Sequence, residues 1–237
     1  MTHLDFCGEI HPITEGATVV VGRDADVVID EDNHYLHRRF LAVTMTGGFV
    51  WLENVGSQLS ATLADEHGLV QTWLAPGSRV PVVFPRSVVY FTAGPTTYDL
   101  ELYVDDPPFV PQHVEQDSAG TTTVGRVSFT PDQRLLCLAL AEDVLRRGVR
   151  GRAQIPPSAE AAAKLGWTST KFNRKLDNVC EKLAKTGVRG LTSVEGRPAS
   201  DRRSRLVEYV VASRLVVPED LLFLDEARAF ARRPKAD

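Results

Sequence analysis

The pattern of apolar and polar positions changes about halfway along the 237-residue chain. From residue 3 to about residue 104, short apolar stretches are separated by Gly, Pro and Asp, which is typical of β-strands joined by turns. After residue 130, apolar residues recur every three or four positions, the period of an amphipathic helix. The pattern therefore predicts an all-β N-terminal half and a mainly α C-terminal half.

The N-terminal half contains many short β segments and no helical periodicity. Turn signals such as Thr46-Gly47-Gly48 and Ala75-Pro76-Gly77 fall between them. This favours a β-sandwich over a parallel α/β sheet. The predicted strands are Thr18–Val21, Val27–Ile29, Leu41–Met45, Phe49–Glu53, Val80–Phe84, Val88–Thr92 and Tyr98–Tyr103.

Residues 105–125 read DDPPFVPQHVEQDSAGTTTVG and lack periodic hydrophobic positions. A segment rich in Pro, Gly, Ser, Thr and acidic residues is typical of a linker. We therefore divide the chain into a β-sandwich domain over residues 1–104, a linker over 105–125 and a helical domain over 126–237.

Residues 158–187, SAEAAAKLGWTSTKFNRKLDNVCEKLAKTG, predict two helices joined by a tight turn at Gly166. Ser158 and Thr168 are suited to cap the two helices. The apolar stripe of the second helix consists of Phe172, Leu176, Val179 and Leu183. Its opposite, polar face carries Thr170, Lys171, Arg174, Asn178 and Lys185. This stretch resembles a DNA-binding helix-turn-helix. The alternative is an ordinary helical hairpin with a solvated basic face.

The segments around this unit extend the resemblance to a winged helix, from Phe129 to about Val217. Thr130-Pro131-Asp132-Gln133 predicts a helix start with a capping box. We expect a strand over Gly190–Val194, a basic loop over Glu195–Arg205 and a returning strand over Leu206–Val211. A helix over Arg205–Leu215 fits the same apolar positions and stays open. Pro218 begins a last helix, and Arg232–Lys235 is expected to be a frayed tail.

The winged-helix resemblance implies a division of roles on duplex DNA. A recognition helix contacts base edges with the exposed residues of its first turns, while basic residues and a wing hold phosphates. We expect base-edge contacts from Thr170, Arg174 and Asn178. The expected phosphate contacts are Lys171, Lys175, Arg202, Arg203 and Arg205.

Several N-terminal motifs suggest a family: Gly22-Arg23 after a Val-rich strand, VVID leading to LHRRF, WLENVGSQLS and LAPGSRV. Together they resemble a forkhead-associated (FHA) domain over essentially the whole N-terminal half. The resemblance implies a β-sandwich that binds phosphothreonine peptides through loops at one end, with arginine and hydroxyl donors on the phosphate. The pairing of such a domain with a winged helix looks like proteins of actinobacteria.

The resemblance places a degenerate phosphopeptide site at Arg23, His37 and Arg38. The family's arginine falls on Arg23, its phosphate-contacting serine on His37 and the next basic residue on Arg38. His37 is expected to join the arginines when protonated. The family's loop-bracing histidine falls on Phe40, and its Asn-Gly pair falls on Leu59-Ser60, so the asparagine that grips the peptide backbone is absent. We therefore expect phosphothreonine binding to be weakened or lost, and the domain to bind an unmodified partner or to serve structurally.

Composition excludes several classes of protein. No apolar run is long enough for a membrane span, and MTHLDFCGEI is unlike a signal peptide, so we expect a cytoplasmic protein. Three scattered cysteines without a CxxC pair argue against disulfides and zinc. No phosphate-binding Gly-rich loop, nucleophile motif or metal-ligand spacing occurs, so we expect no catalytic residue, cofactor or metal.

The two halves differ in charge. Residues 1–124 carry five Arg, no Lys and 17 acidic residues, whereas residues 125–237 carry 22 basic and 14 acidic residues. Since the basic excess surrounds the helix-turn-helix, the sequence predicts a DNA-binding transcriptional regulator whose FHA-like domain docks a signalling partner. Two alternatives stay open: an adaptor of Ser/Thr kinase signalling that binds proteins through both domains, and an RNA-binding protein.

Overall fold

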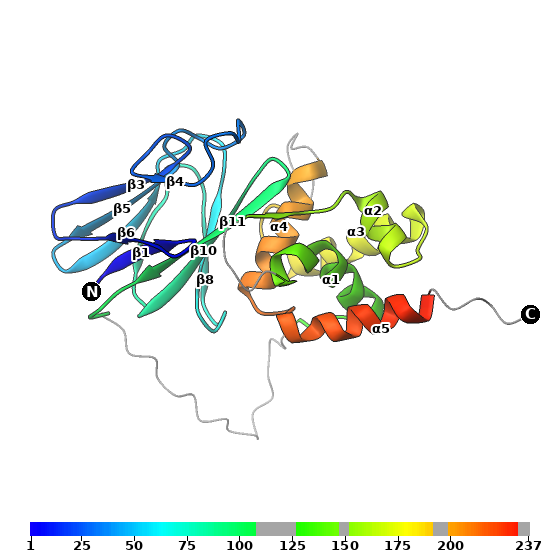
Figure 1. Ribbon diagram of the computed structural model, residues 1–237. Helices are drawn as coiled ribbons and strands as arrows, with labels where there is room; N and C mark the ends of the chain where they lie inside the picture. The colour runs from blue at the N-terminus through cyan, green and yellow to red at the C-terminus, as the bar shows by residue number, and fades with distance from the viewer. Residues whose placement is uncertain (108–126, 147–151, 192–198, 232–237) are drawn as a thin grey trace, which may run out of the picture.

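Two β-sheets form the N-terminal half in the computed structural model, which describes residues 1–107, 127–146, 152–191 and 199–231 (Figure 1). One sheet has the strand order β2-β1-β11-β10-β7-β8, and the other has the order β4-β3-β5-β6-β9. The predicted β-sandwich is therefore confirmed. The strands are β1 (His3–Phe6), β2 (Glu9–Pro12), β3 (Thr18–Gly22), β4 (Val27–Val28), β5 (Leu41–Thr46), β6 (Phe49–Asn54), β7 (Ala61–Asp65), β8 (Gln71–Leu74), β9 (Arg79–Val82), β10 (Arg86–Ala93) and β11 (Thr96–Tyr103).

The sandwich core is formed by alternating apolar residues of both sheets. Phe40, Phe91 and Tyr98 lie at its centre, with ring centroids 4.9 Å apart for the first pair and 5.3 Å for the second. The Tyr98 hydroxyl donates to Asp30 at 2.6 Å and accepts from the Asn33 amide at 2.7 Å. Burial raises the pKa of Tyr98 to about 12, so the phenol stays protonated and ties the β4–β5 loop to the core.

The C-terminal half is helical and has its own apolar core. Its elements are α1 (Pro131–Arg146), β12 (Arg152–Gln154), α2 (Ser158–Lys164), α3 (Ser169–Lys185), α4 (Ala199–Ala212), the 3₁₀ turn η1 (Pro218–Asp220) and α5 (Leu221–Ala231). The predicted capping box opens α1: the Gln133 amide nitrogen donates to the Thr130 hydroxyl at 3.3 Å, and the Thr130 amide donates to the Gln133 side chain at 3.0 Å. The last helix was predicted to begin at Pro218; that residue opens the 3₁₀ turn η1, and α5 follows from Leu221.

The returning strand predicted over Leu206–Val211 is wrong, because these residues lie in α4. Leu206, Val207 and Val210 are almost fully buried, at 0%, 1% and 0% exposure. Positions i, i+1 and i+4 share one face of a helix, so a helix buries all three at once, whereas a strand would divide them between two faces. The helical alternative for this segment was therefore the correct one. Of the predicted Gly190–Val194 strand, residues 190 and 191 are not in a strand and the others lie outside the described residues, as does Arg232–Lys235.

The two halves are joined by a strand and a helix. β12 pairs antiparallel with β11, Thr96 facing Gln154, so the C-terminal half adds a strand to the sandwich. α4 lies between the sandwich and the other helices, packed on β7 and β10 on one side and on α1 on the other (Figure 1). A Cβ at Gly68 would collide with the carbonyl oxygen of Ala212, so the β7–β8 turn closely approaches the end of α4.

Candidate functional site

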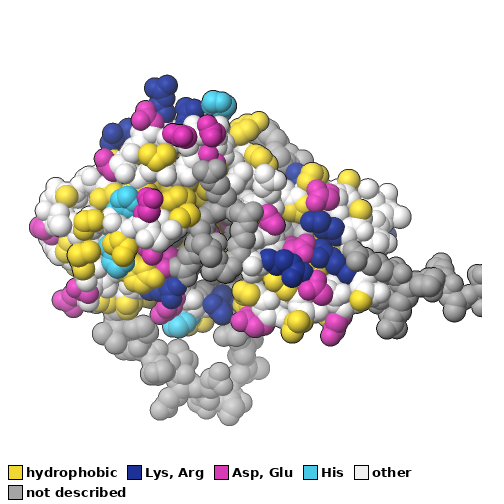
Figure 2. Space-filling view, in the orientation of Figure 1, with side chains coloured by type: hydrophobic (Ala, Val, Ile, Leu, Met, Phe, Trp, Pro, Cys, Tyr) yellow, Lys and Arg dark blue, Asp and Glu magenta, His cyan; other side chains and the backbone are white. Residues whose placement is uncertain are grey.

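The loops at the top of the sandwich bring the predicted phosphopeptide residues together. Gly22 lies so close to the backbone of Arg38 that an added Cβ would overlap its carbonyl oxygen. The amide of Arg23 donates to the carbonyl of His37 at 2.9 Å, which holds the β3–β4 and β4–β5 loops side by side. Figure 2 shows basic side chains gathered at this end of the molecule, beside acidic ones and a histidine.

Arg23 and Arg38 differ in their freedom to bind an anion. Arg23 is partly buried, and its Nη1 lies 3.1 Å from Nδ1 of His34. Its Nε is buried without a hydrogen-bond partner among the described residues. Arg38 and the neighbouring Arg39 are exposed. The tip therefore keeps cationic donors, although the Arg23 guanidinium is partly occupied by His34.

His37 is a brace between loops in this structure. Its Nε2 accepts a hydrogen bond from the amide of Ser57 at 3.1 Å, and its ring stacks on Phe40 at 5.8 Å. Burial lowers the pKa of His37, and protonating Nε2 would break the bond from Ser57. We therefore expect the ring to stay neutral, contrary to the sequence-based hypothesis that a protonated His37 joins a phosphate site.

Asn54 organises the loop that carries Leu59. The side chain of Asn54 is fully buried; its amide donates to the carbonyls of Leu59 at 2.8 Å and Leu74 at 3.1 Å, and its oxygen accepts from the amide of Gly56 at 3.0 Å. Leu59 itself is partly buried against the sandwich core. Sequence reasoning missed Asn54; the only signal was an amide at the end of an apolar strand.

The two helices predicted over residues 158–187 are present and are joined by a tight turn at Gly166. Gly166 has φ 66°, and the amide of Trp167 donates to the carbonyl of Ala162 at 2.9 Å, which closes the turn. The Thr168 hydroxyl accepts from the amide of Lys171 at 3.2 Å and caps α3. By contrast, Ser158 is the first residue of α2 rather than its cap, and Pro157 precedes it without a side-chain bond.

α3 has one buried face and one exposed face. The apolar stripe Phe172, Leu176, Val179 and Leu183 is buried. Thr170, Arg174 and Asn178 are exposed and lie at intervals of four residues, so they share the outward face. Within the described part of the chain, no carboxylate forms an ion pair with Arg174. The three predicted base-edge residues therefore point to one common surface.

Lys171 and Lys175 lie at the side of this surface. Their ammonium groups lie 3.7 Å and 3.1 Å from the carboxylate of Asp132 on α1. The Lys171 ammonium also lies 4.0 Å from the centre of the Trp167 ring. Both lysines are partly exposed, so these contacts are surface pairs.

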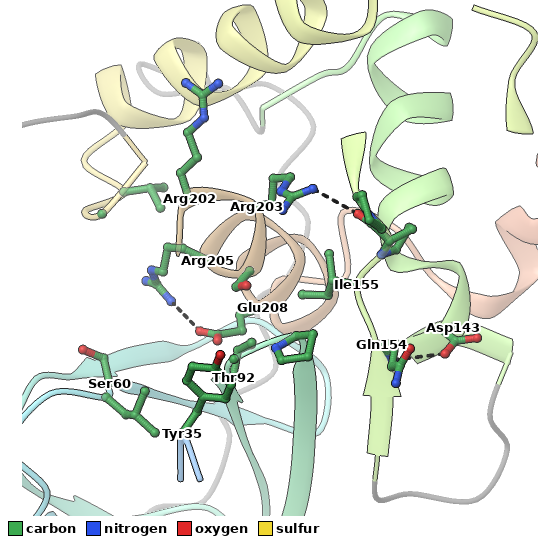
Figure 3. A pocket seen from close by; sticks show the side chains of 18 of the residues that line it. Tyr35, Ser60, Thr92, Asp143, Gln154, Ile155, Arg202, Arg203, Arg205 and Glu208 are labelled. Atoms are coloured by element: carbon green, nitrogen blue, oxygen red, sulfur yellow. Dashed lines mark hydrogen bonds and ion pairs between the residues drawn. The ribbon is translucent and has the colours of Figure 1, made fainter. Parts of the chain in front are cut away.

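The three arginines expected on a wing lie in the first turns of α4 instead and point in different directions (Figure 3). Arg202 pairs with Asp177 of α3 at 2.8 Å. Arg203 donates to the carbonyl of Pro156 at 3.2 Å. Arg205 points to the sandwich, where it donates to the Thr62 hydroxyl at 2.6 Å. A strand with a basic hairpin tip was predicted; the helical segment uses these side chains to hold the protein together.

Arg205 and Glu208 form a buried pair between the two halves. Their side chains are 12% and 6% exposed, and the Nη1 and Oε2 atoms lie 3.6 Å apart. Burial raises the pKa of Glu208 to about 7, although the charge of Arg205 and a hydrogen bond from Thr92 act in the opposite direction. No sequence pattern predicts the position of this pair at the sandwich, since Arg205 and its hydrogen-bond partner Thr62 are 143 positions apart.

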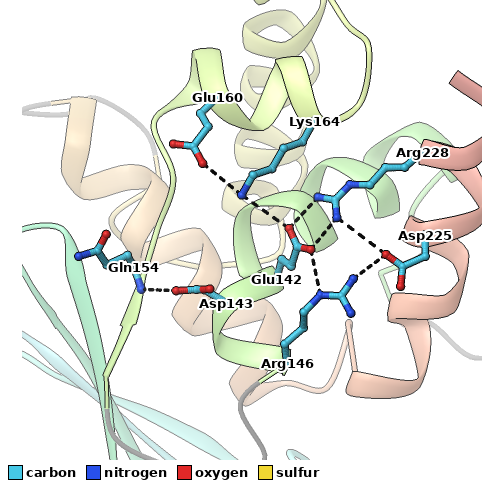
Figure 4. A network of polar contacts seen from close by, with 8 residues as sticks. All are labelled: Glu142, Asp143, Arg146, Gln154, Glu160, Lys164, Asp225 and Arg228. Carbon is cyan, nitrogen blue, oxygen red and sulfur yellow. Dashed lines mark hydrogen bonds and ion pairs between the residues drawn. The ribbon is translucent and has the colours of Figure 1, made fainter. Parts of the chain in front are cut away.

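A second polar network, also unforeseen, ties α1 to α2 and α5 (Figure 4). Arg228 donates to both oxygens of Glu142 at 2.6 Å, and Arg146 and Lys164 contact the same carboxylate at 2.9 and 3.7 Å. Hydrogen bonds from Arg228, followed by Arg146, hold the pKa of Glu142 down to about 2. This network is a structural clamp of the helical half.

Two further observations concern cofactors and membranes. The described residues contain no group of three or more His, Cys, Asp or Glu side chains placed to hold a metal ion. None of the helices in the described part of the chain has both the length and the apolar character needed to cross a membrane.

Comparison with known proteins finds a similarity to a solved structure. No protein family and no curated protein matches the chain. Among solved structures, the chain is similar to the crystal structure of FHA-1 of Rv1747 from Mycobacterium tuberculosis, with 19% identity and a TM-score of 0.31. The similarity covers 44% of this chain and 94% of that domain.

Proposed function

We propose that the chain is a non-enzymatic DNA-binding regulator in which α3 is the recognition helix and the FHA-like sandwich docks a protein partner. One observation carries the proposal: Thr170, Arg174 and Asn178 are exposed on a single face of the capped helix α3, which follows α2 after a tight turn. An arginine and an amide side chain on such a face are suited to guanine and adenine edges in the major groove.

Lys171 and Lys175 are the phosphate contacts in this proposal. Each would leave Asp132 on binding, and partly exposed ion pairs are worth only about 0–1 kcal/mol, so this exchange costs little. Arg205 is no longer a candidate, because its guanidinium is committed to Thr62 and Glu208. Arg202 and Arg203 contact DNA only if they give up Asp177 and the Pro156 carbonyl. Fewer phosphate contacts imply that affinity depends less steeply on salt. The logarithm of the affinity should fall by about 0.9 per contact for each tenfold rise in salt concentration.

The experiment is selection from a random duplex library with the full chain, followed by affinity measurements on selected and random DNA. Arg174→Ala should cost about 1–3 kcal/mol on the selected site and little on random DNA, since a base-edge contact carries sequence specificity. Arg39→Ala, which removes an equal charge from an exposed position on the sandwich, is the matched control. An equal loss on both DNAs would make Arg174 a phosphate contact, and failure to enrich any sequence would reject the regulator function.

An adaptor is the second candidate, favoured by the replacement of the wing with α4. The arginines of α4 form contacts within the protein instead of extending a basic surface beside α3. The outward face of α3 therefore has few neighbouring cations to hold DNA phosphates. In that case the exposed face of α3 would bind a protein. The same selection experiment separates the two functions, because an adaptor enriches no duplex.

The partner site at the sandwich tip is expected to bind phosphothreonine weakly or not at all. His37 is engaged with Ser57, and Leu59 lacks an amide to grip a peptide backbone. Calorimetry of the full chain with a phosphothreonine peptide library tests this. Micromolar binding that requires the phosphate and is abolished by Arg23→Ala would overturn it.

A further inference from the structure

A cleft of about 1800 Å³ separates the sandwich loops from the helical half (Figure 3). Its sandwich wall is formed by loop residues, and its other wall includes the segment after α3 and the first turns of α4. The sandwich wall includes Tyr35, Leu59, Trp73 and Gly94. Small-molecule pockets usually measure about 300–1000 Å³, so this space is too large for one small ligand and suits a length of peptide.

Three of the four carboxylates that line the cleft, those of Glu142, Glu160 and Glu208, lie beside a cationic side chain. Glu142 is held by Arg228 and Arg146, and Glu208 faces Arg205. Lys164 pairs with Glu160 at 3.2 Å. Asp143 accepts from the backbone amide of Gln154 at 3.0 Å. The acidic lining groups therefore have little attraction left for a cationic ligand.

Two arginines of the lining lack such compensation. Arg189 is exposed, and within the described ranges no carboxylate pairs with it. Arg203 is partly buried and donates to a neutral backbone carbonyl, that of Pro156. Both guanidinium groups are always charged, so this wall attracts a carboxylate or another anion.

The opposite wall presents an exposed aromatic side chain. Tyr35 is 69% exposed, and an added Cβ at Gly94 would strike its ring, so the ring lies against the backbone of the β10–β11 turn. The Tyr35 amide donates to the Asn33 side chain at 2.9 Å, which fixes the loop. Tyrosine and arginine are the residue types enriched at energetically important positions of protein interfaces.

We propose that this cleft binds an extended, acidic segment of a protein partner, with Tyr35 on one wall and Arg189 and Arg203 on the other. A peptide fits better than nucleic acid, because Arg189 and Arg203 are the lining cations without a carboxylate partner among the described residues, and two cations suit two separate carboxylates better than a continuous phosphate backbone. The cleft is a protein-binding surface distinct from the sandwich tip, and the inference rests on the proposed docking of a protein partner. It does not depend on DNA binding by the outward face of α3.

The test uses the full chain and an array of twelve-residue peptides in which acidic and aromatic positions vary, with each Glu and Asp also replaced by Gln and Asn. The tightest acidic peptide is then labelled and measured by fluorescence anisotropy. Arg189→Ala with Arg203→Ala should weaken binding at least about tenfold, and Tyr35→Ala should weaken it about fivefold. Arg39→Ala with Arg79→Ala removes the same charge from exposed positions of the sandwich outside the cleft and should change affinity less than about twofold.

Other outcomes would overturn the proposal. One is that no acidic peptide binds better than its amide control. Another is that the two double variants lose peptide affinity equally. Binding that needs phosphothreonine in place of Glu and is lost in Arg23→Ala would move the partner to the sandwich tip. Displacement of the peptide by duplex DNA, with equal loss of both ligands in the Arg189/Arg203 variant, would assign the cleft to nucleic acid. Arg174→Ala should leave peptide affinity unchanged, which separates this proposal from the DNA proposal.

Discussion

The guanidinium of Arg205 on α4 donates to the hydroxyl of Thr62 on β7 at 2.6 Å, across the boundary between the helical half and the sandwich. Arg205 also donates to the carbonyl of Arg189 at 3.2 Å and lies 5.7 Å from the centre of the Trp73 ring. One side chain thus links the segment after α3, the helix α4 and the sheet.

Arg205→Ala should therefore destabilise the protein by about 3–5 kcal/mol, because it leaves the buried Glu208 without its partner. Thr62→Val keeps the shape and removes one hydrogen bond, so it should cost about 1–3 kcal/mol. Urea unfolding of the two single variants and the double variant measures the coupling between the two side chains. The exposed Arg39→Ala should stay within about 0.5 kcal/mol of wild type. Additive effects of Arg205 and Thr62 would show that the contact contributes nothing.

The pKa of Glu208 gives a pH dependence at neutral pH. It is raised from 4.5 to about 7, so the folded protein binds more protons than the unfolded chain between these values. Stability from this group is therefore complete below pH 4.5 and falls as pH rises towards and through 7, by roughly 3 kcal/mol at most. Glu208→Gln should flatten the difference in unfolding free energy between pH 5 and pH 8. An unchanged difference would mean that Glu208 does not titrate in this range.

The ionisation of Glu142 should change the free energy of unfolding with pH in the opposite direction to that of Glu208, and in a lower pH range. Its pKa is lowered from 4.5 to about 2, so its contribution is present above pH 4.5 and is lost as pH falls towards 2. Glu142→Gln should cost about 2–3 kcal/mol at pH 7 and almost nothing at pH 2. Urea titrations at the two values, followed by helical circular dichroism, test this. A constant cost at both values would point to lost packing rather than lost charge.

Gly22→Ala should be one of the most damaging glycine substitutions in the sandwich. The added methyl group overlaps the backbone of Arg38, which cannot rotate away as a side chain would. We expect a loss of about 2–4 kcal/mol and separation of the two tip loops. Gly47→Ala is the control, because it meets no atom within 4 Å and has only the strain of φ 61°, about 1 kcal/mol. Equal melting temperatures for the two variants would contradict the close approach.

Local sequence determined those elements whose signals lie within a few residues of one another. The seven strands predicted in the N-terminal half match observed ones to within two residues, because alternating polarity fixes which face is buried. The capping box at Thr130 and the cap at Thr168 were predictable, because each cap and the amide it accepts from are three residues apart. The outward stripe of α3 was likewise fixed by helical periodicity.

Tertiary structure decided the features that depend on distant partners. Leu206–Val211 fits a strand or a helix by its own pattern, and the surfaces of α1, β7 and β10 selected the helix by burying one side of α4. His37 is a brace because the loop carrying Ser57 lies beside it. Arg205 belongs to the domain boundary because folding brings it to Thr62, and no local pattern encodes a contact between residues 143 positions apart.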